Sequence, residues 1–227
     1  MTIIRDFFMK KILLFIAAVF CLCLSCSCSS SPEYLEYVSQ IRTDAFFGSG
    51  KFFEVVAYSE LKETPLVSDG YAGEMSAFLI LKVRVLENEN MLINGLSADF
   101  SLDRDYKVSL PYSAAFDSYV ASVLTPTVQK EDFVLTITYG ETTENVTMQS
   151  ARAKGLTAND ALKTAIKHKK ALVDKLIEDK SPFEIMIRFM TEGDGTYFYV
   201  GIVEAEYTTA LLISSDGKVL AEKRLKN

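Results

Sequence analysis

The sequence predicts an α+β protein in two parts, and three stretches of different periodicity carry this prediction. Between residues 51 and 150, apolar and polar residues alternate in short runs separated by turn residues, which is typical of antiparallel strands. From Thr157 to about Glu178, apolar residues recur every three to four positions and indicate a helix. After Pro182 the alternation returns. We therefore expect an antiparallel β-sandwich over 51–150, followed by a helix packed on a small antiparallel sheet over 156–227.

The chain begins with residues that are typical of an export signal. Lys10 and Lys11 precede an uncharged apolar run of 13 residues, Ile12 to Leu24. As a helix this run would reach about 20 Å, less than the ~30 Å hydrocarbon core of a bilayer. The sequence therefore predicts a signal peptide over residues 1–26 rather than a spanning helix.

The end of this leader resembles the lipidation site of bacterial lipoproteins, in which an aliphatic residue and two small residues precede the modified Cys. Ser25 precedes Cys26 here, with Cys23 where Leu is usual and Leu24 where Ala or Ser is commoner. Cys28 is the alternative acceptor. The resemblance implies several acyl chains, such as palmitate, that hold the protein stably on the outer face of the cell membrane. Plain secretion and a retained membrane anchor remain alternatives.

Cysteine usage and charge exclude several classes of function. All four Cys residues lie in the leader or at its edge, so a disulfide framework, a thiolate metal site and a Cys nucleophile are excluded for the folded part. The leader contributes a net charge of +2, so the remainder of a chain whose total is −6 carries −8. Such an acidic chain is a poor candidate for binding nucleic acid or anionic lipid surfaces.

Residues 27–50 are expected to form a tether and a short helix. Residues 27–32 are rich in Ser and end in Pro, which is typical of a flexible connection. Tyr34, Leu35, Val38 and Ile41 then recur at helical spacing, so we expect an amphipathic helix over 33–43.

The predicted sandwich contains six to eight short strands. The longest, over 72–87, alternates Leu79, Leu81 and Val83 against Ile80 and more polar positions. The stretch 119–124 fits either a strand or a helical turn. The other expected strands lie at 51–59, 96–102, 106–110, 132–139 and 145–149. The strand count resembles an immunoglobulin-like sandwich, although the chain has no Trp.

A change of period at 151–155 marks the predicted domain boundary. Thr157 and Asp160 form a capping-box pattern, and the helix that follows is expected to bury one apolar stripe up to Pro182. Three strands and a short fourth are expected after it, at 183–190, 196–206, 207–213 and 219–221.

These last seventy residues resemble the PepSY family. The likeness consists of the spacing of Ala161 and Ala165, the aromatic strand Tyr197–Gly201 and the closing hairpin Ser215–Leu220, with Asp216 where Thr is common. The resemblance implies an extracellular α+β module that mediates interactions or inhibits enzymes. It brings no catalytic residues.

One surface and few chemical groups stand out as candidate sites. Tyr197, Tyr199, Met186 and Met190 would form an apolar and aromatic sheet face, for packing against the first domain or for binding a ligand or peptide. The single His168 lies among lysines and cannot build a zinc triad. The acidic residues of the segment 99–105 could bind Ca²⁺, but they lack the bidentate Glu of an EF-hand. We expect no catalytic residues, no metal and no cofactor.

The sequence therefore predicts a cell-surface lipoprotein that is not an enzyme and that binds or modulates a protein or peptide partner at the envelope. The strand Tyr207–Ile213 would serve as an exposed edge for β-augmentation. A module that binds cell wall or carbohydrate is the alternative, with Tyr71, Tyr112 and Tyr119 as stacking rings. A hydrolase with distant carboxylates is the third hypothesis. The oligomeric state, the Gram type and the identity of the partner stay open.

Overall fold

A computed structural model describes residues 34–65, 67, 69–86, 95–152, 155–193 and 195–227. The signal peptide, Cys26, Cys28 and the predicted tether lie outside the described residues. Tyr37–Asn227 form one compact unit. Within the described part of the chain, every helix is too short or too polar to cross a membrane.

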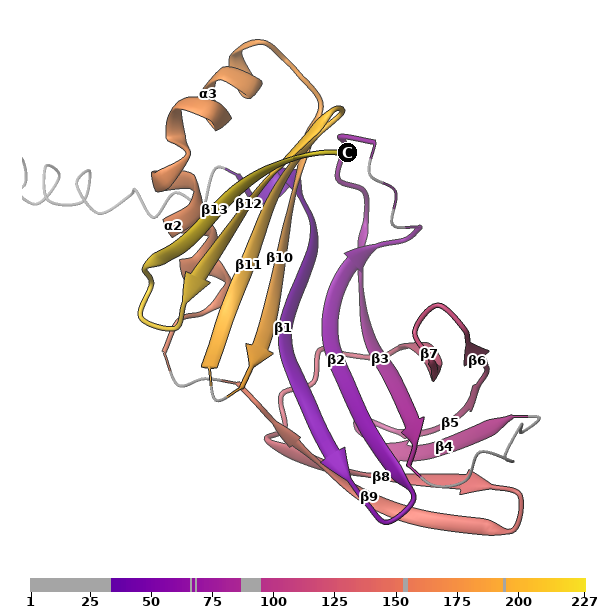
Figure 1. Cartoon of the computed structure of the whole chain (residues 1–227). Coiled ribbons are helices and arrows are strands. Elements are labelled where there is room, and N and C mark those ends of the chain that lie inside the picture. The colour runs from indigo at the N-terminus through magenta and orange to yellow at the C-terminus, as the bar shows by residue number, and fades with distance from the viewer. Residues whose placement is uncertain (1–33, 66, 68, 87–94, 153–154, 194) are drawn as a thin grey trace, which may run out of the picture. The chain divides into compact units, whose positions relative to one another are not determined.

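Thirteen strands form a single sheet (Figure 1). Its main path runs β13-β12-β11-β10-β1-β2-β3-β7-β6, and β9, β8, β4 and β5 continue from β1 as a branch. All pairs are antiparallel except β1 with β10. The strands are β1 Val38–Ser49, β2 Phe53–Glu63, β3 Met75–Val85, β4 Leu96–Ser101, β5 Asp105–Leu110, β6 Tyr112–Ser113, β7 Ser118–Leu124, β8 Asp132–Tyr139, β9 Thr142–Ser150, β10 Phe183–Glu192, β11 Gly195–Glu204, β12 Tyr207–Ser214 and β13 Val219–Lys226.

The described helices are a 3-10 turn, η1 (Leu35–Tyr37), and two short helices, α2 (Ala158–His168) and α3 (Lys170–Glu178). The predicted capping box is confirmed, because the Thr157 and Asp160 side chains each accept a hydrogen bond from the other's backbone N–H. The expected single helix is interrupted at Lys169, where φ is −112° and ψ is 25°. Helix α2 packs on β10, β11 and β12.

A large apolar cluster lies between β1–β3 and the branch strands. The predicted alternation is confirmed there, since Leu79, Leu81 and Val83 are fully buried on one face of β3. Phe46 of β1 meets Phe133 of β8 edge to face, with ring centroids 5.2 Å apart. Figure 1 shows the branch strands at the opposite end of β1 from the helices.

The predicted fold class was wrong. We expected a β-sandwich and a separate helix on a small sheet, but β10–β13 continue the same sheet as β1–β3. The joint is the parallel pair β1–β10, in which Ile41 lies opposite Ile187. Local periodicity says nothing about which distant strands will pair, and two sheets that each leave an edge unpaired satisfy fewer backbone groups than one continuous sheet.

The predicted helix over 33–43 was also wrong, because most of that segment belongs to β1. The register of β1 shifts between Val38 and Gln40 against β10, and between Arg42 and Asp44 against β2. Each irregularity moves the following side chains to the other face, so apolar residues fall three or four positions apart in a strand. The spacing of these apolar residues matches that of a helix. The segment nevertheless forms a strand, because it pairs with β10 on one side and with β2 on the other.

The strand expected to be an exposed edge lies inside the sheet. Strand β12 is hydrogen-bonded to β11 on one side and to β13 on the other. The edge is β13, which is almost entirely exposed and carries Lys223, Arg224 and Lys226. Positive charges along an edge discourage pairing with another strand. The structure therefore gives no support to β-augmentation at 207–213.

The shared core predicts that substitutions of two neighbouring phenylalanines of β1 will differ greatly in their effect on the free energy of unfolding. Phe46 is fully buried and Phe47 is 39% exposed. Phe46→Ala should lower the free energy of unfolding by about 3–5 kcal/mol, because it leaves a cavity between β1 and β8. Phe47→Ala should cost less than about 1.5 kcal/mol. Urea unfolding measures both, and equal losses would contradict the assignment of faces.

Candidate functional site

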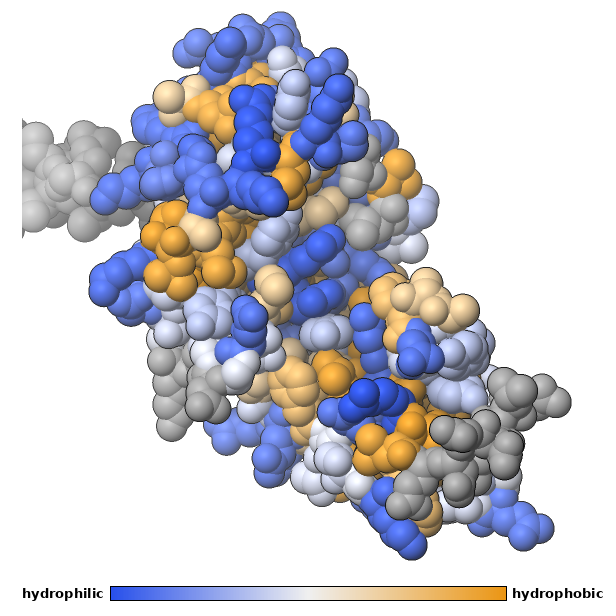
Figure 2. All heavy atoms as spheres, in the orientation of Figure 1, coloured by the Kyte–Doolittle hydropathy of each residue, from blue (hydrophilic) through white to orange (hydrophobic). Residues whose placement is uncertain are grey.

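The sheet has one covered face and one uncovered face. Helix α2 and the branch strands pack on the covered face, and in the described residues no second layer of helices or strands packs on the other. We call the other side the open face, and the register places these side chains on it: Gln40, Arg42, Tyr58, Glu60, Lys62, Phe78, Lys82, Met186, Arg188, Met190, Tyr197 and Tyr199. Hydrophilic and hydrophobic side chains lie interleaved on the surface seen in Figure 2.

A buried carboxylate lies at the centre of the open face. Glu60 is 1% exposed, and its Oε1 lies 2.5 Å from Nη2 of Arg42. The amide of Gln40 donates to the other Glu60 oxygen at 3.1 Å, and Arg188 donates from Nε to the Gln40 oxygen at 2.7 Å. The three strands β10, β1 and β2 are thus linked side chain to side chain around one anion.

Aromatic rings lie among the cations of this face. The guanidinium of Arg42 is 3.9 Å from the centroid of the Tyr58 ring, and the ammonium of Lys82 is 5.7 Å from the same ring. Lys82 also lies 4.2 Å from the ring of Phe116, and Arg188 lies 5.9 Å from that of Tyr199. Such contacts attract a cation to the face of a ring while leaving its charge uncompensated.

The cations outnumber the anions that face them. Burial lowers the pKa of Arg188 from its usual range, and repulsion from Arg42 adds to the shift. Burial and the same repulsion lower the pKa of Lys82, against a smaller opposing effect of Glu60. Lys62, Lys82 and Arg188 form no ion pair with any described residue. The open face therefore carries partly desolvated positive charge in excess.

The four residues proposed from the sequence lie on this face. Met190 is the register partner of Tyr197, and Tyr199 lies opposite Arg188. Met190 is 43% exposed, whereas Met186 is buried. They do not pack against a separate first domain, because the sheet itself continues through β1.

Sequence reasoning missed the charged centre of the open face. Its members come from β10, β1, β2 and β3, so only the strand register brings them together. A partial signal existed in Lys82 and Arg188, because each is a cation with an apolar residue on either side in a strand.

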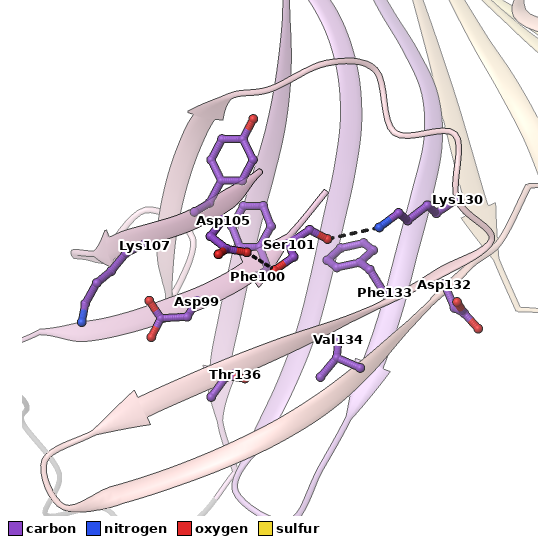
Figure 3. Close-up of a pocket in the computed structure, with 11 residues that line it drawn as sticks. Asp99, Phe100, Ser101, Asp105, Lys107, Lys130, Asp132, Phe133, Val134 and Thr136 are labelled. Carbon is purple, nitrogen blue, oxygen red and sulfur yellow. Dashed lines mark hydrogen bonds between the residues drawn. The ribbon is translucent and has the colours of Figure 1, made fainter. Parts of the chain in front are cut away.

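A broad hollow of about 820 Å³ is lined by residues of β4, β5 and β8 and of the segment just before β8 (Figure 3). Asp99, Asp105 and Asp132 line it together with Lys107 and Lys130. The Asp105 carboxylate accepts a hydrogen bond from Ser101, and Lys130 donates to the Ser101 carbonyl at 3.3 Å. Carboxylates and ammonium groups are mixed along its walls, and among the described residues no group of His, Cys, Asp or Glu could hold a metal ion. The hollow therefore offers no distinct chemistry.

A second cavity, of about 400 Å³, lies on the covered face beside the start of α2, with Ile41, Leu61 and Phe198 among its walls. Arg152, also in the wall, pairs with the buried Asp44 at 3.0 Å. Burial raises the pKa of Asp44, while hydrogen bonds from Ser150 and the charge of Arg152 oppose the shift. The pair ties β1 to the segment that follows β9.

The remaining candidates take structural roles. His168 Nε2 lies 3.1 Å from the Glu222 carboxylate, which also binds Lys169. Tyr119 is only 7% exposed and meets Tyr112 edge to face, so it cannot act as a stacking ring for a sugar.

The buried ion pair predicts that two identical substitutions on β2 will differ in effect. Glu60→Gln should lower the free energy of unfolding by about 2–3 kcal/mol, because the loss of one partner of a buried pair leaves the charge of the other without a counter-charge. Glu54→Gln breaks only the pair with Arg84, whose side chains are 44% and 62% exposed, and is the matched control. It should cost less than about 1 kcal/mol. Chemical unfolding of both variants is the measurement, and a Glu60 variant as stable as the control would refute the role of this carboxylate.

Comparison with known proteins gives no relative for the chain. No protein-family model matches it, and no curated protein or solved structure matches it significantly. The resemblances to lipoproteins and to PepSY modules therefore stay predictions from the residues, and the site has to be interpreted from its own geometry.

Proposed function

We propose that the protein is a non-catalytic lipoprotein on the outer face of a bacterial cell membrane, and that it binds a protein or peptide partner through the open face. The observation that carries this proposal is the uncovered sheet face, with its rings, its methionines and its excess of cations. Groups of this kind make contacts across an interface, and the uncovered face of a sheet can present many of them at once.

The sequence of the leader supports the location. An apolar run too short to span a bilayer and a Cys at its end favour export followed by lipidation. Two or more acyl chains give stable attachment, at ~0.8 kcal/mol for each buried CH₂ group. The net charge of the chain is −6, which does not favour attachment to anionic lipids by charge alone.

The distribution of titratable groups supports a binding role over a catalytic one. Acid–base catalysis needs a group tuned toward the working pH at an accessible position. The carboxylate at the centre of the open face is buried and paired with Arg42. The cell-wall or carbohydrate alternative has only Tyr71 and Tyr112 as strongly exposed rings among the three proposed, so we keep it as an outcome of the second test below.

The lipid anchor predicts a change of location on removal of two cysteines. Cys26→Ala together with Cys28→Ala should move the protein from the membrane fraction to the soluble fraction, because no acceptor for the acyl chains remains. The matched control is Cys21→Ala, which lies outside the motif that ends at Cys26 and should stay in the membrane fraction. Immunoblots of both fractions are the measurement, and membrane association of the first variant unchanged from wild type would exclude the anchor.

Partner binding predicts an effect of substitutions on the open face. On intact cells, some partner protein should cross-link to the wild type. The double variant Met190→Ser with Tyr199→Ala should recover at least about fivefold less of that partner. Val134→Ser, at a 49% exposed site on β8, is the control and should leave that recovery unchanged. Quantitative mass spectrometry of the cross-linked material is the readout. Equal recovery by all three would contradict the face, and recovery of wall glycan alone would favour the alternative.

A further inference from the structure

We propose that the open face recognises an acidic peptide segment of its partner, with carboxylates lying against Arg42, Lys82 and Arg188. This inference rests on the proposed function and specifies the chemistry of the partner. The carboxylates that the register places on this face already have partners. Glu60 is held by Arg42 and Gln40. Glu54 pairs with Arg84, and Glu184 accepts a hydrogen bond from the backbone N–H of Gly70 at 2.8 Å.

The state of the cations is the first support. Arg188 has an amide oxygen and a thioether, from Gln40 and Met186, as its hydrogen-bond acceptors. Among the described residues, Lys82 lies against the aromatic rings of Tyr58 and Phe116 and forms no hydrogen bond or ion pair. Both side chains are partly removed from water and repelled by Arg42, so a carboxylate that approaches them replaces lost hydration with a charge-assisted hydrogen bond.

The spacing of the cations is the second support. Arg188 and Arg42 lie on neighbouring strands, and Lys82 lies two strands beyond on β3. At ~4.8 Å between strands, the cluster spans about 14 Å across the sheet. One carboxylate cannot reach both ends. In an extended chain, alternate residues lie ~6.6 Å apart on the same side, so three acidic residues at alternate positions, which cover about 13 Å, match the span.

The surroundings of the cations favour a peptide over a long polyanion. Tyr58, Phe78 and Tyr199 separate the charged groups, and these rings suit the apolar side chains that a peptide can carry between its acids. Away from the cluster, the chain is acidic, with a total charge of −6, and would repel a uniform polymer of negative charge. A short acidic segment meets only the local excess of cations.

Fluorescence anisotropy with the full-length protein in detergent micelles tests this inference. The probe is a labelled octapeptide of alternating Glu and Thr, and its control has Gln in place of every Glu. Lys82→Gln is the main variant. Lys82 makes no hydrogen bond to any described residue, so its substitution breaks no hydrogen bond of the fold. Lys107→Gln, on β5 and outside the open face, is the matched control variant. Circular dichroism verifies that both variants are folded.

We expect the Glu peptide to bind and the Gln peptide not to bind. Lys82→Gln should weaken binding about five- to tenfold, as expected for one charge-assisted contact, and Lys107→Gln should leave it unchanged. Raising the salt from about 0.05 M to 0.5 M should weaken binding further. Equal binding of both peptides, or an equal effect of both substitutions, would overturn the inference. So would tighter binding of inorganic polyphosphate or of a DNA oligonucleotide. If cross-linking still recovers a protein partner, the proposed function survives such a failure.

Discussion

Strand β1 is hydrogen-bonded on both sides, to β2 in the antiparallel sense and to β10 in the parallel sense, and the rest of the fold depends on this. A parallel neighbour requires a long crossover connection. Here that connection contains β2 to β9 and both α-helices. The branch strands and the helices, which cover the sheet, therefore lie in sequence between β1 and β10, the two strands that join its halves. Both pack on the same side of the sheet.

The open face follows from that arrangement. With the helices and the branch strands both on the covered side, no other helix or strand of the described residues covers the opposite side of β10, β1, β2 and β3, which must satisfy its own polar groups. Glu60, Gln40, Arg42 and Arg188 do so through a chain of hydrogen bonds that crosses three strands. A buried ion pair adds little net stability, because desolvation offsets the attraction between its charges. An excess of cations in such a setting is easier to understand as a binding surface than as a device for stability.

The sequence predicted local features well and distant pairing poorly. The buried faces of β2, β3, β8 and β10 and the cap at Thr157 follow from alternation and from a short motif, each of which concerns neighbours in the chain. Strand β1 was missed because its two register shifts break the period of two. The single sheet and the charged centre of the open face were missed for one common reason. The partners of Arg42 are 18 and 146 positions away in sequence, and no periodicity encodes which strands meet.

The most direct test of this account is a disulfide cross-link between β1 and β10. Residues 29–227 contain no Cys, so Ile41→Cys with Ile187→Cys introduces the only two thiols of that part of the chain. The two positions are register partners, which places their Cα atoms at about 5 Å, within the range that a disulfide bridges. The control, Ile41→Cys with Ile213→Cys, spans three strand spacings, about 14 Å, and should stay reduced. Mass spectrometry after mild oxidation should show near-complete formation of the first disulfide. A folded first variant that keeps both thiols free would contradict the continuous sheet, and with it the open face.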